Sequence, residues 1–320
     1  RAAAARRYSW RLRKWMQYAA GKSLHNVPQG VGRAYVPAAI EGYFNDLTGK
    51  TGWAGDCDPA GIPIVTTDRG NRFSFPITVF QKGLGHWDAW LLSRGSRPYE
   101  REQFIAIAKW AVATIDTQGG WECWRLLDRG AATPYSSMAQ GQGVSVLARA
   151  YSTTGDSGFV DAARAAATAM VDPRSTLGVA RRDSEGLWLE EYPGSAMPAV
   201  LNGWIFSLMG LHDLSLVASH PGADSALRET LATLAAALPR YDVGFWSQYD
   251  LGGTIASPFY HRLHIAQLRV LARTFPAHAG AFDGVADRWA AFDRQRFSRA
   301  RAIAVKVAQK LKSAGNEEFT

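Results

Sequence analysis

Cysteine is scarce in this chain, which has only Cys57 and Cys123 among its 320 residues. Two cysteines cannot build a framework of several disulfides. Neither has a Cys or His at metal-ligand spacing, so a fold of the zinc-finger type is excluded. Two reduced, buried thiols are the simplest interpretation. A single disulfide would require the two residues to be neighbours in space.

Long apolar runs and nucleotide-binding loops are also missing. No run approaches the roughly 18 apolar residues that indicate a membrane span. Neither a GxGxxG nor a GxxxxGK[ST] pattern occurs. We therefore expect no membrane span and no organic cofactor. The first residue is Arg rather than Met, which leaves open a removed leader or anchor. The localisation stays open between a bacterial cytoplasm and a truncated protein of the secretory pathway.

The composition is that of a globular protein with a positive net charge. Hydrophobic residues make up 47% of the chain, and the formal net charge is +8. A positive field attracts polyanions, so nucleic acid, an anionic membrane and an acidic polysaccharide all fit. Two basic runs account for much of the excess, and such runs are typically solvated helix faces. They are Arg6, Arg7, Arg11, Arg13 and Lys14, and Arg299, Arg301, Lys306, Lys310 and Lys312.

From about Glu100 onward, apolar residues recur at helical spacing, and the second half is predicted to be nearly all helix. The tetrapeptide Val-Leu-Ala-Arg at 146–149 recurs 124 residues later at 270–273, and the helical segment 207–211 lies midway, which suggests a 62-residue repeat. Links with Gly or Pro at 155–158, 221–222 and 276–280 divide each unit into two helices. Stacked helical hairpins can curve into a ring. We therefore predict a mainly α fold, an incomplete α/α toroid with a central cleft.

The first hundred residues have a different character. A basic helix is predicted around 9–20, followed by a stretch rich in Gly, Asp and Pro at 41–70. Residues 62–65 and 72–75 are short alternating or β-branched runs between turn residues, which is typical of a β-hairpin. We place the change of character near Pro98. The prediction is an N-terminal helix and β-hairpin region at 1–98 that contributes to the cleft, and a toroid domain at 99–320 that carries the chemistry.

Four segments combine polar, aromatic and titratable side chains that a packed helix does not need. The pair Glu190 and Glu191 illustrates the two interpretations, because adjacent glutamates are most often surface residues. If that segment is extended, Glu191 shares a face with Leu187 and Leu189, and burial would raise its pKa toward acid–base work. The four segments are 134–143, 188–194 together with Asn202, 244–251 and 259–264.

His261 and His264 are three residues apart and share a helix face, which is a spacing that metal ligands use. No carboxylate stands at matching helical spacing. A hydrogen-bonded structural pair is therefore the favoured interpretation, and no metal site is predicted.

The motifs in these segments, taken in order, resemble those of the D-glucuronyl C5-epimerases. The matching stretches are 135–142, Glu190-Glu191-Tyr192-Pro193, 200–203, 249–251 and 260–268. The resemblance extends from about Gly61 to Arg288, and includes 61–64, 75–77 and 83–86. It implies an enzyme that converts D-glucuronate to L-iduronate within a heparosan-like polysaccharide by inverting C5.

The resemblance also implies roles for individual residues. Glu191 and Tyr260 would carry protons on opposite faces of the sugar, Tyr249 would be a further essential phenol, and Tyr192 and Asn202 would position the substrate. The remaining predicted substrate-binding residues are Arg72, Phe75, Gln81, Lys82, Tyr135, Ser136, Ser137, Met138, Gln140, His261, Arg262 and His264. Of these, His261, His264, Arg262, Lys82 and Arg72 are the cations that could compensate the uronate charge.

The partner implied is an anionic, glucuronate-containing polysaccharide rather than nucleic acid, and family habit suggests a homodimer. Two departures from the family pattern stand out. Animal members insert a β-sandwich after the Gly-Leu-x-His segment, and their calcium site lies in that insert, so neither is expected here. This chain also has Gly252 where the family has Arg, and Phe206 where it has Tyr.

Two rival functions remain open on the residues alone. A polysaccharide lyase or hydrolase could use Tyr, His and Glu in a helical cleft, and a lyase shares the first proton abstraction. A noncatalytic glycan-binding module is the other alternative. The density of titratable groups in four separate segments argues against it.

Overall fold

Helical hairpins form most of the computed structural model, which describes residues 27–67, 70–127 and 130–312. The first pair is α2 (Pro76–Leu92) with α3 (Pro98–Thr114), and the second is α4 (Ser137–Thr154) with α5 (Ser157–Val171). The third pair is α6 (Leu201–Val217) with α7 (Pro221–Ala237), and the fourth is α8 (Pro258–Thr274) with α9 (Ala279–Arg294). The last described helix is α10 (Arg296–Lys312). The helix predicted at 9–20 lies outside the described residues.

Local sequence signals explain where these helices begin and end. Proline occupies the first turn of α2, α3, α7 and α8, where its missing N–H costs nothing. Asp156 caps α5 by accepting a hydrogen bond from Gly158 N, and Gly155 ends α4 at φ 72°. The inner helices α4, α6 and α8 start at residues 137, 201 and 258, close to the predicted spacing.

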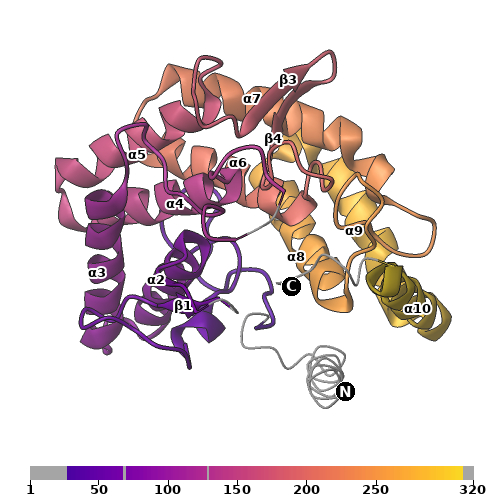
Figure 1. Cartoon of the computed structure of the whole chain (residues 1–320), viewed down its shortest axis with the longest axis horizontal. Coiled ribbons are helices and arrows are strands. Elements are labelled where there is room, and N and C mark those ends of the chain that lie inside the picture. The colour runs from indigo at the N-terminus through magenta and orange to yellow at the C-terminus, as the bar shows by residue number, and fades with distance from the viewer. Residues whose placement is uncertain (1–26, 68–69, 128–129, 313–320) are drawn as a thin grey trace.

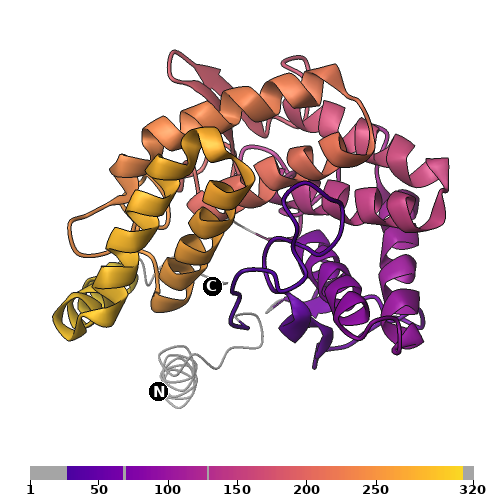
Figure 2. The ribbon, with the colours of Figure 1, turned by 180° about the vertical axis from the view of Figure 1, so that it is seen from behind.

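The pairs follow one another along an open arc, from α2 and α3 through α6 and α7 to α8, α9 and α10 (Figures 1 and 2). Helix α4 packs against α6, and α6 packs against α8, while α5, α7 and α9 each pack on the helix before them. The predicted mainly α fold with a small N-terminal hairpin is confirmed, and the open arc is compatible with an incomplete toroid.

The closest helix contact joins α4 and α6 through two glycines. A Cβ atom at Gly141 would lie 2.5 Å from Ser207 Cα and 2.6 Å from Phe206 O. A Cβ at Gly210 would lie 2.3 Å from Gly141 O. Ser207 Oγ also donates a hydrogen bond of 2.8 Å to Ser137 Oγ across the same contact. These residues fix the distance between the two helices.

Two small hairpins complete the fold. Strand β1 (Val65–Thr66) pairs with β2 (Arg72–Phe73) in antiparallel register, with Val65 opposite Phe73, inside the stretch predicted to be a hairpin. Strand β3 (Ala180–Asp183) pairs with β4 (Gly186–Leu189), and Leu187 N donates to Thr233 Oγ1 of α7. This second hairpin is the exception to the prediction that the second half is nearly all helix. Short 3-10 turns are η1 (Thr48–Thr51), η2 (Leu238–Tyr241) and η3 (Pro276–His278).

The helical pattern starts earlier than predicted, because α2 lies before residue 100. Gly83 and Gly85 interrupt its apolar periodicity, yet both allow close packing: a Cβ at Gly83 would meet Ile107 of α3 at 2.7 Å. Helices α2 and α3 pack together across Pro98, so the division into 1–98 and 99–320, which stays a prediction, would fall between two partner helices.

The cysteines are only partly as expected. Both are free, and Cys123 is buried as predicted, whereas Cys57 is exposed. Cys57 lies in the irregular stretch before β1, where no hydrophobic layer covers it. In the described part of the chain, no helix has the length and apolarity that crossing a membrane requires.

The segment before α2 spans the arc at the C-terminal ends of its inner helices. Tyr35 Oη shares a hydrogen bond of 2.7 Å with Thr274 Oγ1 of α8, and Pro37 O is 3.0 Å from His212 Nε2 of α6. Arg149 of α4 donates to Glu41 O and Gly42 O. The same guanidinium makes a buried ion pair of 2.6 Å with Asp213 of α6. The segment therefore ties three successive pairs together.

Candidate active site

The candidate site lies at the opposite ends of the inner helices, where α4, α6 and α8 begin. Two loops reach these starts through backbone hydrogen bonds. Ser137 N donates to Glu190 O at 3.0 Å, and Leu201 N donates to Tyr249 O at 3.0 Å. These bonds satisfy amides that the helices cannot pair internally. Tyr249 thereby lies next to Tyr260, in the first turn of α8, and Glu191 is close enough for its charge to act on Tyr249.

Glu191 is buried, as its alternation with Leu187 and Leu189 predicts; 5% of the residue is exposed. Its carboxylate lies against the first turn of α6, because a Cβ at Gly203 would come within 2.3 Å of Glu191 Oε2. The positive end of the helix dipole favours a negative charge at this place. Trp124 Nε1 donates to Glu191 O at 3.0 Å and holds the backbone of the residue.

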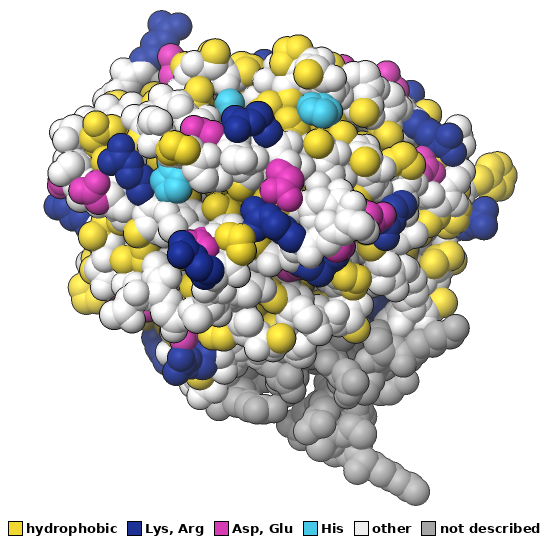
Figure 3. All heavy atoms as spheres, turned by 90° about the horizontal axis from the view of Figure 1, so that it is seen from above, with side chains coloured by type: hydrophobic (Ala, Val, Ile, Leu, Met, Phe, Trp, Pro, Cys, Tyr) yellow, Lys and Arg dark blue, Asp and Glu magenta, His cyan; other side chains and the backbone are white. Residues whose placement is uncertain are grey.

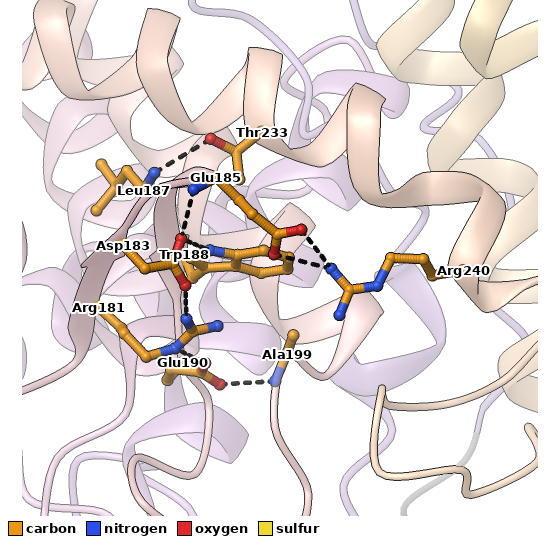
Figure 4. Close-up of polar contacts among 9 residues, drawn as sticks. All are labelled: Arg181, Asp183, Glu185, Leu187, Trp188, Glu190, Ala199, Thr233 and Arg240. Atoms are coloured by element: carbon orange, nitrogen blue, oxygen red, sulfur yellow. Dashed lines mark hydrogen bonds and ion pairs between the residues drawn. The ribbon is translucent and has the colours of Figure 1, made fainter.

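Glu190 has a different environment, although it is just as buried. Its Oε2 accepts a hydrogen bond of 2.7 Å from Ala199 N, and its Oε1 is 3.3 Å from Arg181 Nε (Figure 4). Ala199 has the left-handed φ of 52° and also accepts a hydrogen bond from Tyr241 Oη. Glu190 therefore holds the turn that leads into α6.

Tyr249 and Tyr260 face each other with ring centroids 4.7 Å apart at 60°. Burial raises the pKa of Tyr249 well above its usual value, and the negative charge of Glu191 raises it further. Glu191 also raises the pKa of the Cys123 thiol, after the larger effect of burial. The Tyr249 phenol is therefore protonated near neutral pH, and a carboxylate and two phenols share one small volume.

An aromatic wall lies beside this trio. Tyr192 stacks on Trp124 with centroids 4.5 Å apart, and Phe75 contacts the same indole at 5.6 Å. An open pocket of about 270 Å³ lies next to it, lined by Trp124, Arg125, Leu127 and residues 130–134. Trp124 was not predicted as a site residue. Two Trp residues, Trp121 and Trp124, in the irregular stretch 115–136 are the signal that could have drawn attention to it.

Most polar side chains of the 134–143 segment make hydrogen bonds within the protein, and some have no such partner among the described residues. Gln140 accepts a hydrogen bond from Trp121 N and donates to Gly119 O at 2.8 Å, so it has a structural role. Tyr135 Oη donates to Asp116 Oδ2 at 2.6 Å. Ser137 bonds Ser207, and Met138 is buried. Ser136 is also buried, and its Oγ has no hydrogen-bond partner in the described part of the chain.

Further buried polar atoms without hydrogen-bond partners among the described residues lie on the inner helices. They include both amide atoms of Gln142 in α4, Asn202 Oδ1 in α6, and Gln267 Oε1 in α8. Gln267 Nε2 reaches Asn202 O at 3.5 Å, which joins α8 to the first turn of α6. Asn202 was predicted, whereas Gln142 and Gln267 were not, although both occur in the quoted motifs.

The two histidines form a hydrogen-bonded chain through Ser247. His261 Nε2 is 3.0 Å from Trp289 O and must donate to it, so His261 Nδ1 accepts the bond of 2.8 Å from Ser247 Oγ. Ser247 Oγ then accepts from His264 Nδ1 at 3.3 Å. His264 Nε2 remains as an acceptor, with no hydrogen-bond partner in the described residues.

Burial keeps both rings neutral. It lowers the pKa of His261 to about 4 and the pKa of His264 well below its usual value. Within 27–67, 70–127 and 130–312, no group of three or more His, Cys, Asp or Glu side chains is arranged to hold a metal ion. The pair makes a hydrogen-bonded structure with Ser247 and Trp289.

The remaining predicted basic residues point to other partners. Arg72 pairs with Asp56 at 2.8 Å, and both side chains are more than half exposed. Arg262 pairs with Asp293 at 3.0 Å. Lys82 is buried and donates to Gly61 O at 2.9 Å. Gln81, its neighbour in α2, is also buried.

Both departures from the family pattern have local structural contexts. A Cβ at Gly252 would lie 2.5 Å from Ala196 O and 3.2 Å from Pro198 Cδ, so a side chain there would require the backbone to move. Phe206 stacks on Tyr43 of the N-terminal segment, with centroids 6.3 Å apart at 6°.

Two known proteins are similar in sequence to this chain. The chain is 31% identical to a D-glucuronyl C5-epimerase of Caenorhabditis elegans over 218 residues, which cover 60% of this chain and 35% of that protein. It is 29% identical to an uncharacterised protein of Methanocaldococcus jannaschii over 136 residues, which cover 41% of this chain and 44% of that protein. The matches thus span less than half the length of either relative.

Residues 125–291, more than half of the chain, match the family described as the D-glucuronyl C5-epimerase C-terminus. The matched range contains the starts of α4, α6 and α8 together with Glu191, Tyr249 and Tyr260. The chain therefore belongs to the D-glucuronyl C5-epimerase C-terminal family.

Proposed function

We propose that this chain is a uronosyl C5-epimerase that converts D-glucuronate to L-iduronate within a heparosan-like polysaccharide. The observation that carries the proposal is the grouping of the buried Glu191 carboxylate with Tyr249 and Tyr260 at the starts of the inner helices. The family membership supports the same reaction class. The polymer and its N-substitution are proposed from the resemblance.

The reaction needs two proton carriers on opposite faces of one carbon. One carrier removes the proton from C5, and the electron pair of the broken C5–H bond enters the C5–C6 bond, so the carboxylate becomes an enediolate. The other carrier then protonates C5 from the opposite face, which restores the carboxylate. Atoms and electrons balance without an oxidant or a co-reactant. Glu191 and Tyr260 are the proposed carriers.

Tyr249 and the inner-helix amides have supporting roles in this proposal. A protonated Tyr249 can donate a hydrogen bond to the carboxylate as its negative charge grows. Asn202 and Gln267 offer acceptors to the hydroxyl groups of the sugar. Tyr192 and Trp124 provide an apolar stack of the kind on which sugar rings rest.

The test is proton NMR of N-acetylheparosan incubated with the enzyme in deuterium oxide. We expect loss of the C5 proton signal and the appearance of iduronate signals. Glu191→Gln and Tyr260→Phe should each abolish the exchange, while the matched surface variants Glu185→Gln and Tyr99→Phe retain it. Normal exchange in both site variants would refute the assignment of the carriers.

A polysaccharide lyase is the competing function, because it begins with the same proton abstraction. The family match does not favour it. A lyase expels the C4 substituent and leaves an unsaturated uronate, which absorbs in the ultraviolet. A rise in absorbance without iduronate would replace the proposal with the lyase reaction.

A further inference from the structure

The proposed reaction requires a positive charge near Tyr249 to balance the negative charge of the substrate. The uronate carries one negative charge, and its enediolate carries a second as the C5 proton leaves. The charged group that acts most strongly on the Tyr249 phenol is the negative Glu191. A second negative group next to Glu191 needs a nearby cation.

The five cations predicted from the sequence are held elsewhere or are neutral. Arg72 and Arg262 pair with carboxylates, and their side chains are 57% and 49% exposed. Lys82 is held by the carbonyl of Gly61. His261 and His264 are neutral near pH 7, because burial lowers the pKa of each.

Helix α10 brings a different cation to the site. The sequence suggested a solvated basic face for this helix, but its Ala302 is buried with Trp246 and Ile255. Gln309 Oε1 accepts a hydrogen bond of 3.0 Å from Ile255 N, and Gln309 Nε2 donates one of 2.8 Å to Gly253 O. The helix is thus docked on the loop that carries Tyr249.

Lys306 lies on this docked face, four residues after Ala302 and three before Gln309, a spacing that places all three on one side of a helix. Its Nζ is 6.0 Å from the centroid of the Tyr249 ring. Its charge also acts on Asp250, the neighbour of Tyr249: burial raises the pKa of Asp250, and Lys306 opposes that rise. By contrast, Arg299 on the same helix is exposed.

We propose that Lys306 of α10 is the cation that binds the uronate carboxylate beside Tyr249 and stabilises its enediolate form. This inference rests on the proposed C5-epimerase function. It assigns a substrate-binding role to a helix that lies outside the family match, which ends at residue 291. The ammonium gains interaction energy as the second charge develops, so its removal should lower kcat more than it raises KM.

The test compares Lys306→Met with Lys306→Arg and with the matched control Arg299→Met, which removes one positive charge from the same helix. C5–deuterium exchange on N-acetylheparosan gives kcat and KM, and thermal unfolding checks the fold. For Lys306→Met we expect kcat to fall by about tenfold, the effect typical of one charge at a partly buried site. Lys306→Arg should recover most of the activity, and Arg299→Met should leave kcat unchanged.

Several outcomes would overturn the inference. Equal kcat in Lys306→Met and wild type would do so, and so would equal losses in Lys306→Met and Arg299→Met. A rise in KM with unchanged kcat would also overturn it, because Lys306 would then act in capture of the polymer and not on the enediolate. If Lys306→Met unfolds, Lys306→Gln keeps a polar side chain in its place, and normal kcat in that variant would also refute the role. A wild-type enzyme without exchange would instead refute the proposed function itself.

Discussion

At the scale of single residues, two adjacent glutamates have separate roles. Glu190 and Glu191 are equally buried, but they lie in different hydrogen-bond environments. Glu190 binds Ala199 N and Arg181 and supports the turn before α6. Glu191 lies against Gly203 beside the phenols. Identical side chains at consecutive positions therefore contribute to stability and to the proposed chemistry respectively.

Substitution of each glutamate by glutamine should separate these roles. Glu190→Gln weakens a charge-assisted hydrogen bond and an ion pair, so we expect a loss of about 1–2 kcal/mol in the free energy of unfolding with C5 exchange retained. Glu191→Gln should keep most of the stability and lose the exchange. Urea unfolding and NMR exchange measure the two effects. The same pattern of losses in both variants would contradict the separation.

The hydrogen-bonded chain through Ser247 predicts opposite tautomers for the two neutral histidines, His261 and His264. His261 should carry its proton on Nε2 and His264 on Nδ1, because Ser247 Oγ lies between their Nδ1 atoms. Side-chain ¹⁵N shifts distinguish the two tautomers directly. Ser247→Ala should release His264 into a mixture of tautomers and leave His261 as it is, since Trp289 O still holds it. Observation of the Nε2–H form of His264 in the wild type would show that the proposed directions of the hydrogen bonds through Ser247 are wrong.

At the scale of elements, close contact between α4 and α6 sets the geometry of the site. Gly141 and Gly210 let the helices approach, and the starts of the same helices contact the loops of Glu191 and Tyr249. A wider spacing would separate those starts. The contact therefore links the packing of α4 against α6 to the positions of the proposed proton carriers.

Gly141→Ala should force α4 and α6 apart. Its added methyl group would meet backbone atoms of Phe206 and Ser207, so we expect a loss of about 2–3 kcal/mol of stability. Gly284→Ala in α9 is the matched control, because nothing lies within 4 Å of its Cβ position. There the better helix propensity of alanine should add about 0.5–1 kcal/mol. Chemical denaturation tests both, and equal effects would refute the close-contact argument.

At the scale of the whole molecule, the N-terminal segment joins the arc at the ends opposite the candidate site. Tyr35 reaches α8, and the backbone at Glu41 and Gly42 reaches Arg149 of α4. Tyr43 N donates to Asp88 Oδ1 of α2 at 2.8 Å. On the face of the molecule in Figure 3, Lys and Arg are interspersed with Asp and Glu and do not form a single basic patch.

Asp88 makes this attachment sensitive to pH. Burial raises its pKa from 3.8 to about 7. The folded state then retains a proton that the unfolded chain loses, so the contribution of Asp88 to stability is full below about pH 4 and is lost as the pH rises through 7. The loss is of the order of 4 kcal/mol, because the shift is about three pKa units at about 1.4 kcal/mol each.

Asp88→Asn should remove this dependence, since its Oδ1 still accepts from Tyr43 N. Urea unfolding of both proteins at pH 5 and pH 8 isolates the contribution of Asp88 to the free energy of unfolding. The buried histidines have the opposite effect, because their lowered pKa values reduce stability as the pH falls below about 6.5, but this effect is the same in both proteins. The wild type should lose more stability than the variant between pH 5 and pH 8. Parallel changes in the two proteins would show that Asp88 does not titrate in this range.

The sequence by itself determined the helical hairpins, their links and the segments that carry the site, because periodicity, proline and glycine act over a few residues. It singled out Glu191, but it did not predict that Glu190 is equally buried, and it did not separate Gln140 from Gln142. Residues two apart on a helix point about 200° from each other, so packing decides which one forms structural bonds and which one lies unpaired. The position of Lys306 beside Tyr249 depends on contacts between segments more than fifty residues apart. Only the tertiary structure brings such segments together, because no local pattern encodes which distant surface a helix will cover.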